Sequence, residues 1–504
     1  MSTPTPLPLR ASLDHQRKLA KELIRAARAG DPVALARIQA VRPATAPSRT
    51  PALADAQLAI AREAGFASWP KLVSDFQERD VKAFCDAVRA GDVGRTRQLL
   101  ASSHVRERIN NPMFDFGQRA AHIAAKNEVM LTMLIDAGAD VNLKSDWQNG
   151  PYSVLDNADD GTARFLLARG AALTPNVAAR LGWFDELRAL VDADDSLVHA
   201  RGGDGQQPLH EAKTVAIADF LLARGAGIDV RCLDHHSTPA QYALVDRPDV
   251  CRRLLKRGAT PDIFMAARFG DVPLATRLLD SDPACINARI NEPGYPAVPP
   301  FNIYCWTLGF GLSPHAVARQ FGHQQLYDFL VARSPRSIGF VNALLAADEP
   351  LARRMLAEQP TLLSSLTPDE HGHLAHAIFR ERFDAADLML RLGFDPAAGG
   401  VDGGSALHAA CWVGNVRMVE QLLARGGVPI DARDPAHRST PLGWAAFGSV
   451  HRRAEGGDYV GVVERLVAAG ADVTQPGNGE GRTLVEMARG NAVVQEALRR
   501  LGAS

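Results

Sequence analysis

The sequence lacks the features that would place the chain in a membrane or send it out of the cell. No stretch approaches the roughly 20 apolar residues that span a bilayer. The first residues, MSTPTPLPLRASLDHQRK, contain no apolar core of signal-peptide length. We therefore expect a cytoplasmic protein with no membrane partner. Export by an unrecognised signal stays open, and with it the hypothesis of an effector that acts on a host.

An excess of charge of one sign is also missing. The 56 Lys and Arg residues nearly balance the 57 Asp and Glu residues, which leaves a formal net charge of −1 at pH 7. No overall field attracts nucleic acid, so we expect no nucleic-acid partner. Cysteine is scarce as well, because only six are present and none forms a CxxC pair. Their spacing fits no zinc site, and we expect reduced, buried thiols.

Catalytic motifs are absent from the sequence. There is no GxSxG elbow, no HExxH pair and no glycine-rich phosphate loop after a strand. Helical spacing puts His373 and His376 on one face, but the nearby Asp369 and Glu370 precede that helix. We therefore expect no cofactor, no metal and no catalytic residue, while enzymatic activity remains undecided.

What the sequence does contain is a recurring phrase of two apolar residues, two variable residues, a glycine and a small residue. It occurs as LIDAGA (134–139), LLARGA (166–171 and 221–226), LLKRGA (254–259), LLARGG (422–427) and LVAAGA (466–471). Its glycines are 32 residues apart from Gly138 to Gly170, and 33 apart from Gly225 to Gly258. Glycine enters the left-handed backbone easily, so each phrase predicts the end of a helix.

A shorter, alanine-rich helix is predicted upstream of each phrase. Examples are HIAAKN (122–127), LHAACWVG (407–414) and LGWAAFG (442–448). Asp, Asn, Gly and Pro lie between the units, as turns require. Because a single helix pair cannot bury its own apolar face, the pattern predicts an all-α solenoid of stacked pairs.

This pattern resembles the ankyrin repeat, which reads approximately GxTPLHxAAxxG followed by VxxLLxxGADVN. The best copies are SALHAACWVGNVRMVEQLLARGG (405–427), STPLGWAAFG (439–448), and AAHIAAKN with LIDAGADVN (120–142). The resemblance covers most of residues 81–504 with about a dozen units, several of them eroded. It implies a scaffold that binds a partner protein, and a structural role for the histidines at the TPLH position, His122, His210 and His408.

Both ends differ from the array. Residues 1–80 are predicted to form a helical cap with Pro-rich segments, similar to a short module that precedes ankyrin arrays in some bacterial proteins. Residues 81–504 form the array, and residues 482–504 read as its closing cap.

The resemblance also implies a binding surface. The two residues after the alanine pair face a concave groove, and the turn residues ahead of the first helix form its rim. The groove residues are Arg180, Arg268, Phe269, Trp412 and Phe447, and the rim residues are Trp147, His235 and Arg438. Arginine and aromatic residues carry much of the energy at interfaces. In the alternative interpretation, Trp412 and Phe447 merely pack against the neighbouring first helix.

An aromatic, Pro-rich insertion at 289–310 interrupts the array. A loop of this length in a compact array is usually functional. It supports an alternative function, in which the loop covers a small-molecule or catalytic pocket. The residues expected there are Tyr295, Tyr304, Trp306, His315, Gln320 and His323.

Overall fold

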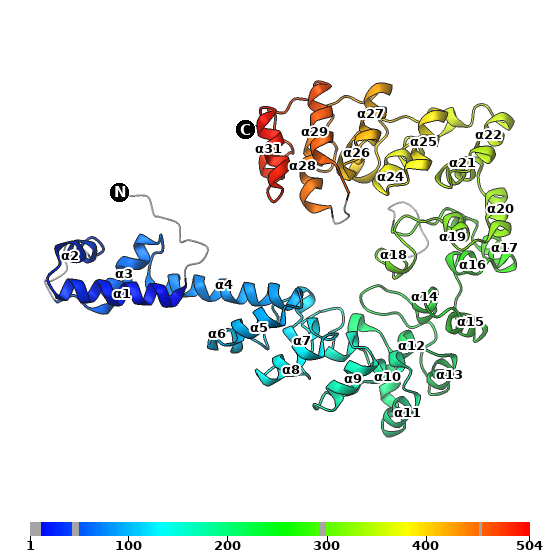
Figure 1. The fold of residues 1–504 in the computed structure, drawn as a ribbon. Coiled ribbons are helices and arrows are strands. Elements are labelled where there is room, and N and C mark those ends of the chain that lie inside the picture. The colour runs from blue at the N-terminus through cyan, green and yellow to red at the C-terminus, as the bar shows by residue number, and fades with distance from the viewer. Residues whose placement is uncertain (1–11, 43–49, 292–298, 453–455, 504) are drawn as a thin grey trace. The chain divides into compact units, whose positions relative to one another are not determined.

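The computed structural model describes residues 12–42, 50–291, 299–452 and 456–503. These residues form α-helices and short 3-10 helices, with no β-strand among them, which confirms the all-α prediction (Figure 1). None of their helices combines the length and apolar character needed to cross a bilayer. The chain divides into two compact units, residues 1–243 with 247–259, and residues 244–246 with 260–504.

Unit 1 contains fifteen α-helices among its described residues. They are α1 (Leu13–Arg28), α2 (Pro32–Gln39), α3 (Leu53–Glu63), α4 (Trp69–Arg89), α5 (Val93–Leu100), α6 (Ser103–Arg106), α7 (Ala120–Ile123), α8 (Glu128–Asp136), α9 (Asp160–Leu167), α10 (Pro175–Leu181), α11 (Phe184–Ala193), α12 (Pro208–Glu211), α13 (Val215–Ala223), α14 (Pro239–Ala243) and α15 (Pro248–Lys256). Its 3-10 helices are η1 (Asp115–Gly117), η2 (Val154–Asn157), η3 (Asp195–His199) and η4 (Gly203–Gly205).

Unit 2 continues the same pattern of short and longer helices. Its described α-helices are α16 (Ile263–Phe269), α17 (Val272–Ser281), α18 (Tyr304–Thr307), α19 (Pro314–Gln320), α20 (Gln324–Arg333), α21 (Arg336–Leu345), α22 (Glu349–Glu358), α23 (Pro368–His371), α24 (His373–Phe379), α25 (Phe383–Leu392), α26 (Ala406–Val413), α27 (Val416–Arg425), α28 (Pro441–His451), α29 (Tyr459–Ala468), α30 (Leu484–Met487) and α31 (Ala492–Arg500). Its 3-10 helices are η5 (Pro283–Asn287), η6 (Leu363–Ser365) and η7 (Val401–Gly403).

The N-terminal module packs three helices around its own small core. Ala20, Leu23, Ile38 and Ile60, from α1, α2 and α3, are all buried there. The following helix, α4, runs without interruption through positions 80 and 81. The module and the first array helix therefore share one helix.

One repeat shows how local sequence sets the boundaries of both helices. The first helix, α26, ends at Gly414, which has φ +69°. Asn415 then caps the second helix, α27, because its side chain accepts a hydrogen bond from the Met418 N–H. That helix ends at Gly426, which has φ +72°. The recurring phrase thus ends a helix where the sequence predicts it.

Neighbouring repeats in unit 1 are joined by asparagine side chains. The amide of Asn142 donates to the Gly170 carbonyl at 2.9 Å and accepts from the Ala172 N–H at 2.8 Å. Asn110 makes the same pair of contacts one repeat earlier, to Gly138 and Asp140. Each asparagine therefore satisfies backbone groups at the glycine turn of the next repeat.

The three TPLH histidines also connect repeats. In His408, Nδ1 accepts from the Ser405 N–H, and Nε2 lies 3.0 Å from the Ala432 carbonyl and 3.2 Å from the Ser439 carbonyl. Carbonyls only accept, so Nε2 carries the proton. His122 and His210 make equivalent contacts in unit 1. All three histidines are buried and structural.

Candidate functional site

Four aromatic residues on the first helices of unit 2 form a continuous cluster, which we call the aromatic groove: Phe379, Trp412, Trp444 and Phe447. They come from α24, α26 and α28, which pack side by side. The rings of Phe379 and Trp412 are stacked, with their centroids 5.9 Å apart and an interplanar angle of 11°. The centroid of the Trp412 ring also lies 6.3 Å from that of Trp444 and 6.2 Å from that of Phe447. These rings line a cavity of about 290 Å³.

Hydrogen bonds fix the position of the groove. The indole of Trp444 donates to Asp434 Oδ2 at 2.9 Å, and this ring is buried. The Tyr459 hydroxyl donates to the Trp412 carbonyl at 2.9 Å, which holds α26 against α29. Phe447 stays 36% exposed. The groove therefore has the buried, hydrogen-bonded Trp444 ring at its base, which we call its floor, and the exposed Phe447 ring at its edge.

Polar side chains surround this cavity, and the ionisable ones lie in two pairs. His437 Nε2 lies 3.3 Å from Asp402 Oδ2, and Arg482 lies 2.8 Å from Glu480. All four line the cavity together with Asn478. The polar groups at the rim are thus paired with each other, and the interior of the cavity stays apolar.

Unit 1 contains a second cavity of different character, which we call the polar pocket. It has a volume of about 260 Å³. Its walls come from η2, η4, α10 and α12. They are formed by Tyr152, Asp156, Asn157, Asn176, Arg180, Gly203, Asp204, Gln206 and Glu211.

Burial governs the electrostatics of the polar pocket. It is the largest cause that raises the pKa of each of three carboxyl groups, Asp156, Asp204 and Glu211. Arg180 opposes this effect at Asp156 and Glu211 through its positive charge. Its Nη2 donates to the carbonyls of Leu155 and Ala158 at 2.9 and 2.7 Å, so the guanidinium is fixed against the η2 turn.

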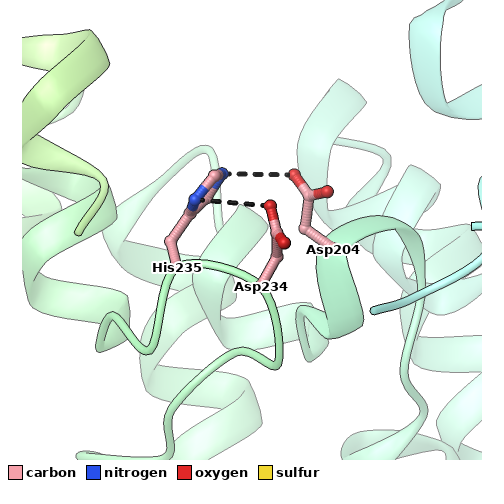
Figure 2. A group of neighbouring side chains, drawn as sticks. All are labelled: Asp204, Asp234 and His235. Atoms are coloured by element: carbon pink, nitrogen blue, oxygen red, sulfur yellow. Dashed lines mark ion pairs between the residues drawn. The ribbon is translucent and has the colours of Figure 1, made fainter. Parts of the chain in front are cut away.

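Asp204 also belongs to a group of ionisable side chains drawn in Figure 2. His235 Nε2 lies 3.6 Å from Asp204 Oδ2, and its Nδ1 lies 3.4 Å from Asp234 Oδ2. Donor atoms of these three residues lie within 4.8 Å of one another, a spacing that a metal ion could use. The imidazole already bridges both carboxylates, and Tyr152 donates its hydroxyl hydrogen to Asp204.

The comparisons with known proteins bear on the groove directly. A family model, the ankyrin repeat, matches residues 402–435, which include α26 and α27. The chain therefore contains an ankyrin repeat. It is also similar to Protein PhlB of Serratia liquefaciens, with 36% identity over 74 residues, or 15% of this chain. The aligned part spans 32% of that relative, so the resemblance is limited to a segment of each protein.

The match and the all-helical structure confirm the predicted ankyrin-type repeat fold. Ankyrin repeats in general take part in protein–protein interaction. Neither comparison identifies a partner.

The structure places three of the predicted residues in unit 2 at the aromatic groove or near it. Trp412 and Phe447 are two of its four rings. Each also packs against the neighbouring first helix, so the alternative interpretation describes part of their role. Arg438 is exposed on the adjacent loop with φ +49°.

Two further predicted residues of unit 2 do not line the groove. The Arg268 guanidinium lies 4.0 Å from the centre of the Phe321 ring. It lies 5.8 Å from the ring of Phe269. These contacts belong to α16 and the end of α19.

In unit 1, the other predicted residues lie at the polar pocket or close to its loops. Arg180 lines the pocket, and His235 contacts the wall residue Asp204. Trp147 packs edge-on against Phe116 at 4.9 Å.

Several important residues escaped the sequence prediction, although signals for them exist. Phe379 precedes Trp412 by 33 residues, one repeat length, and so occupies the equivalent position. Glu211 follows the histidine of PLHE, where the best repeat has Ala409. The other two copies with this histidine have the apolar residues Ile123 and Ala409 at that position, so a carboxylate there stands out.

Five of the six residues predicted for a pocket under the 289–310 loop are described, and these five do not line a common cavity in the described part of the chain. Tyr295 lies outside the described residues. Tyr304 and His315 are fully buried, whereas Trp306 and Gln320 are exposed. The Tyr304 hydroxyl donates to Asp262, and His323 Nε2 lies 3.0 Å from the Arg268 carbonyl. Nothing here supports the alternative function of a lidded pocket.

Proposed function

We propose that this ankyrin-repeat protein binds a partner protein by inserting one apolar side chain of the partner into the aromatic groove. The observation that carries the proposal is an apolar cavity of about 290 Å³ whose ionisable rim residues are paired with each other. This volume is at the lower end of the range for ligand pockets and suits a single large side chain.

The rigidity of the groove supports this function. Trp444 is anchored to Asp434, and the backbone of Trp412 is anchored by Tyr459. A binding surface that is already ordered loses little conformational entropy on association. The half-buried Trp412 and the exposed Phe447 are also aromatic side chains of the kind that contribute strongly to interface energies.

The remaining predicted surface residues would extend the contact beyond the groove. Arg438 is the nearest candidate, because its side chain packs beside Gly479, close to the rim residues Asn478 and Glu480. Arg268 and Phe269 would contribute to a separate part of the surface of unit 2. Arg180, Trp147 and His235 would do so on unit 1.

A peptide selection on the full chain tests the proposal. Peptides from a random library that bind the chain should carry a large apolar anchor, and their binding should change the fluorescence of Trp412 and Trp444. Phe447→Ala should weaken them roughly 30-fold, as expected when a hot-spot side chain worth about 2 kcal/mol is lost.

Trp306→Ala is the matched control, because Trp306 is a more exposed aromatic residue of the same unit that lies outside the groove. Its affinity for the selected peptides should match that of the unsubstituted chain. Peptides that bind Phe447→Ala with unchanged affinity would reject the groove as the binding site.

A further inference from the structure

We propose that the polar pocket of unit 1 is a second binding site, separate from the aromatic groove, and that it takes a guanidinium group. The proposal goes beyond protein binding by the groove and rests on unsatisfied acceptors inside a defined cavity.

The first argument is that acceptors in the pocket wall lack donors. No described residue donates a hydrogen bond to the Glu211 carboxylate, and no ion pair to it is formed within the described part of the chain. Gln206 Oε1 is completely buried and likewise has no hydrogen-bond partner there. Both side chains line the pocket. Leaving the buried Gln206 oxygen unpaired is costly, and the half-buried Glu211 side chain faces the same cavity. A ligand that supplies N–H donors would pair with both.

The second argument is the sign of the charge. Three carboxyl groups, Asp156, Asp204 and Glu211, face one cavity. Two arginines offset them in part, but both are fixed by backbone carbonyls. Arg180 donates to Leu155 and Ala158, and Arg247 donates to His210 and Ala212. The pocket therefore keeps an excess of acidic groups and favours a cation.

The third argument distinguishes a guanidinium group from a metal ion. The donor set that suits a metal is Asp204, Asp234 and His235, and the imidazole already bridges its two carboxylates. The unmet acceptors, Glu211 and Gln206, lie outside that set. A guanidinium carries five N–H donors in one plane and can reach acceptors on several walls. It also stacks on aromatic rings such as that of Tyr152, which lines the same cavity.

Arg180 provides one further clue. Its Nε is buried and has no acceptor among the described residues. A ligand that carries a carboxylate near its guanidinium would gain an additional contact here, as free arginine does. An arginine within a partner protein would offer the guanidinium alone.

Isothermal titration of the full chain with L-arginine and with L-citrulline tests the ligand class. Citrulline replaces the guanidinium by a neutral urea group of the same shape. Binding of arginine at least tenfold tighter than citrulline supports the proposal. A blocked Gly-Arg-Gly peptide that binds more tightly than free arginine identifies a partner protein as the source, and the reverse identifies a free metabolite. Equal binding of arginine and citrulline, or uptake of Zn²⁺ with no arginine binding, would overturn the proposal.

Two variants locate the site. Glu211→Gln should weaken arginine binding by about tenfold or more, because one charge-assisted contact is lost. Glu186→Gln, an exposed glutamate on α11 of the same unit, is the control and should leave the affinity unchanged. Asp156→Asn is the second test if Glu211→Gln fails to fold, as judged by its melting curve. Unchanged affinity in a folded pocket variant would contradict the site.

Two further measurements separate this site from the groove and test its charge. Phe447→Ala should bind arginine normally, so failure of one site is distinguishable from failure of the other. Because burial raises the pKa of the three carboxyl groups, their protonation should weaken binding as the pH falls, starting above the usual carboxyl range. Affinity that rises on acidification would contradict a carboxylate-lined cation site.

Discussion

The aromatic groove and the polar pocket are built on the same kind of helix but have opposite characters. In the groove, rings cover one another and the surrounding charges are paired. In the pocket, Glu211 stands where an equivalent repeat has Ala409, and no described residue donates a hydrogen bond to its carboxylate. The difference shows that a repeat scaffold tolerates either chemistry, because the outer helices, glycine turns and histidine contacts hold the fold independently of these positions. The groove should therefore contribute to stability, whereas the pocket should reduce it.

Removing the floor of the groove should have the largest effect. Trp444→Ala should lower the free energy of unfolding of unit 2 by about 3–5 kcal/mol, because loss of the buried indole leaves a cavity and Asp434 loses one of its three donors. Urea unfolding monitored by circular dichroism measures the loss. Trp306→Ala, at an exposed site, should change stability by less than about 0.5 kcal/mol. A comparable loss of stability in both variants would contradict the claim that the buried Trp444 ring stabilises unit 2.

Acid should weaken the histidine contacts next to the pocket. Burial lowers the pKa of His210 to about 4, from an ordinary value of 6.5. A lowered histidine pKa gives a stabilisation that is present above pH 6.5 and is lost as the pH falls through the folded-state pKa. The free energy of unfolding of unit 1 should fall by on the order of 3 kcal/mol as a result.

Unfolding free energies measured between pH 7 and pH 4 check this expectation. His210→Gln should remove most of the pH dependence, and His199→Gln, an exposed histidine, should leave it intact. Identical pH profiles for the unsubstituted chain and His210→Gln would contradict the assignment.

Removing the charge of Glu211 should stabilise unit 1 at neutral pH. Because burial raises its pKa, the folded chain favours the protonated form of Glu211 more than the unfolded chain does. That contribution is complete below the ordinary glutamate pKa and is lost as the pH rises through the folded-state value. Glu211→Gln should therefore raise stability by roughly 0.5–2 kcal/mol at pH 7, the usual range for a stabilising substitution. Melting at pH 7 and pH 3 tests this, because the gain should disappear at the lower pH.

The helix-ending glycines should give the smallest effect. Gly225 has φ +91° and no atom within 4 Å of the position that a Cβ would occupy. Gly225→Val should therefore cost about 1 kcal/mol through backbone strain alone, without a clash. Gly225→Asn should cost less, because asparagine enters the left-handed region more easily. Equal stability of the Val variant and the unsubstituted chain would mean that this turn relaxes.

The fold was predictable because its signals are local and recur. Each phrase ends a helix at a glycine, as at Gly414 and Gly426, and each TPLH histidine makes the same contacts. Trp412 and Phe447 were also found from their positions within a repeat.

The sites themselves could be predicted only in part. The polar pocket combines Tyr152, Arg180 and Glu211, which lie on three successive repeats, and no local pattern shows that their side chains converge. The lid predicted at 289–310 stays a prediction, because residues 292–298 lie outside the described part of the chain. Within the described part, the Tyr304 hydroxyl donates to Asp262 and that ring is buried, whereas Trp306 is exposed.

Hydrogen–deuterium exchange of the full chain with a selected peptide bound tests the central claim most directly. Our account predicts added protection in α26 and α28, the first helices that carry Trp412 and Phe447. It predicts no added protection in the second helices α27 and α29. Protection confined to α27 and α29, or to unit 1, would show that the aromatic groove is not where the partner binds.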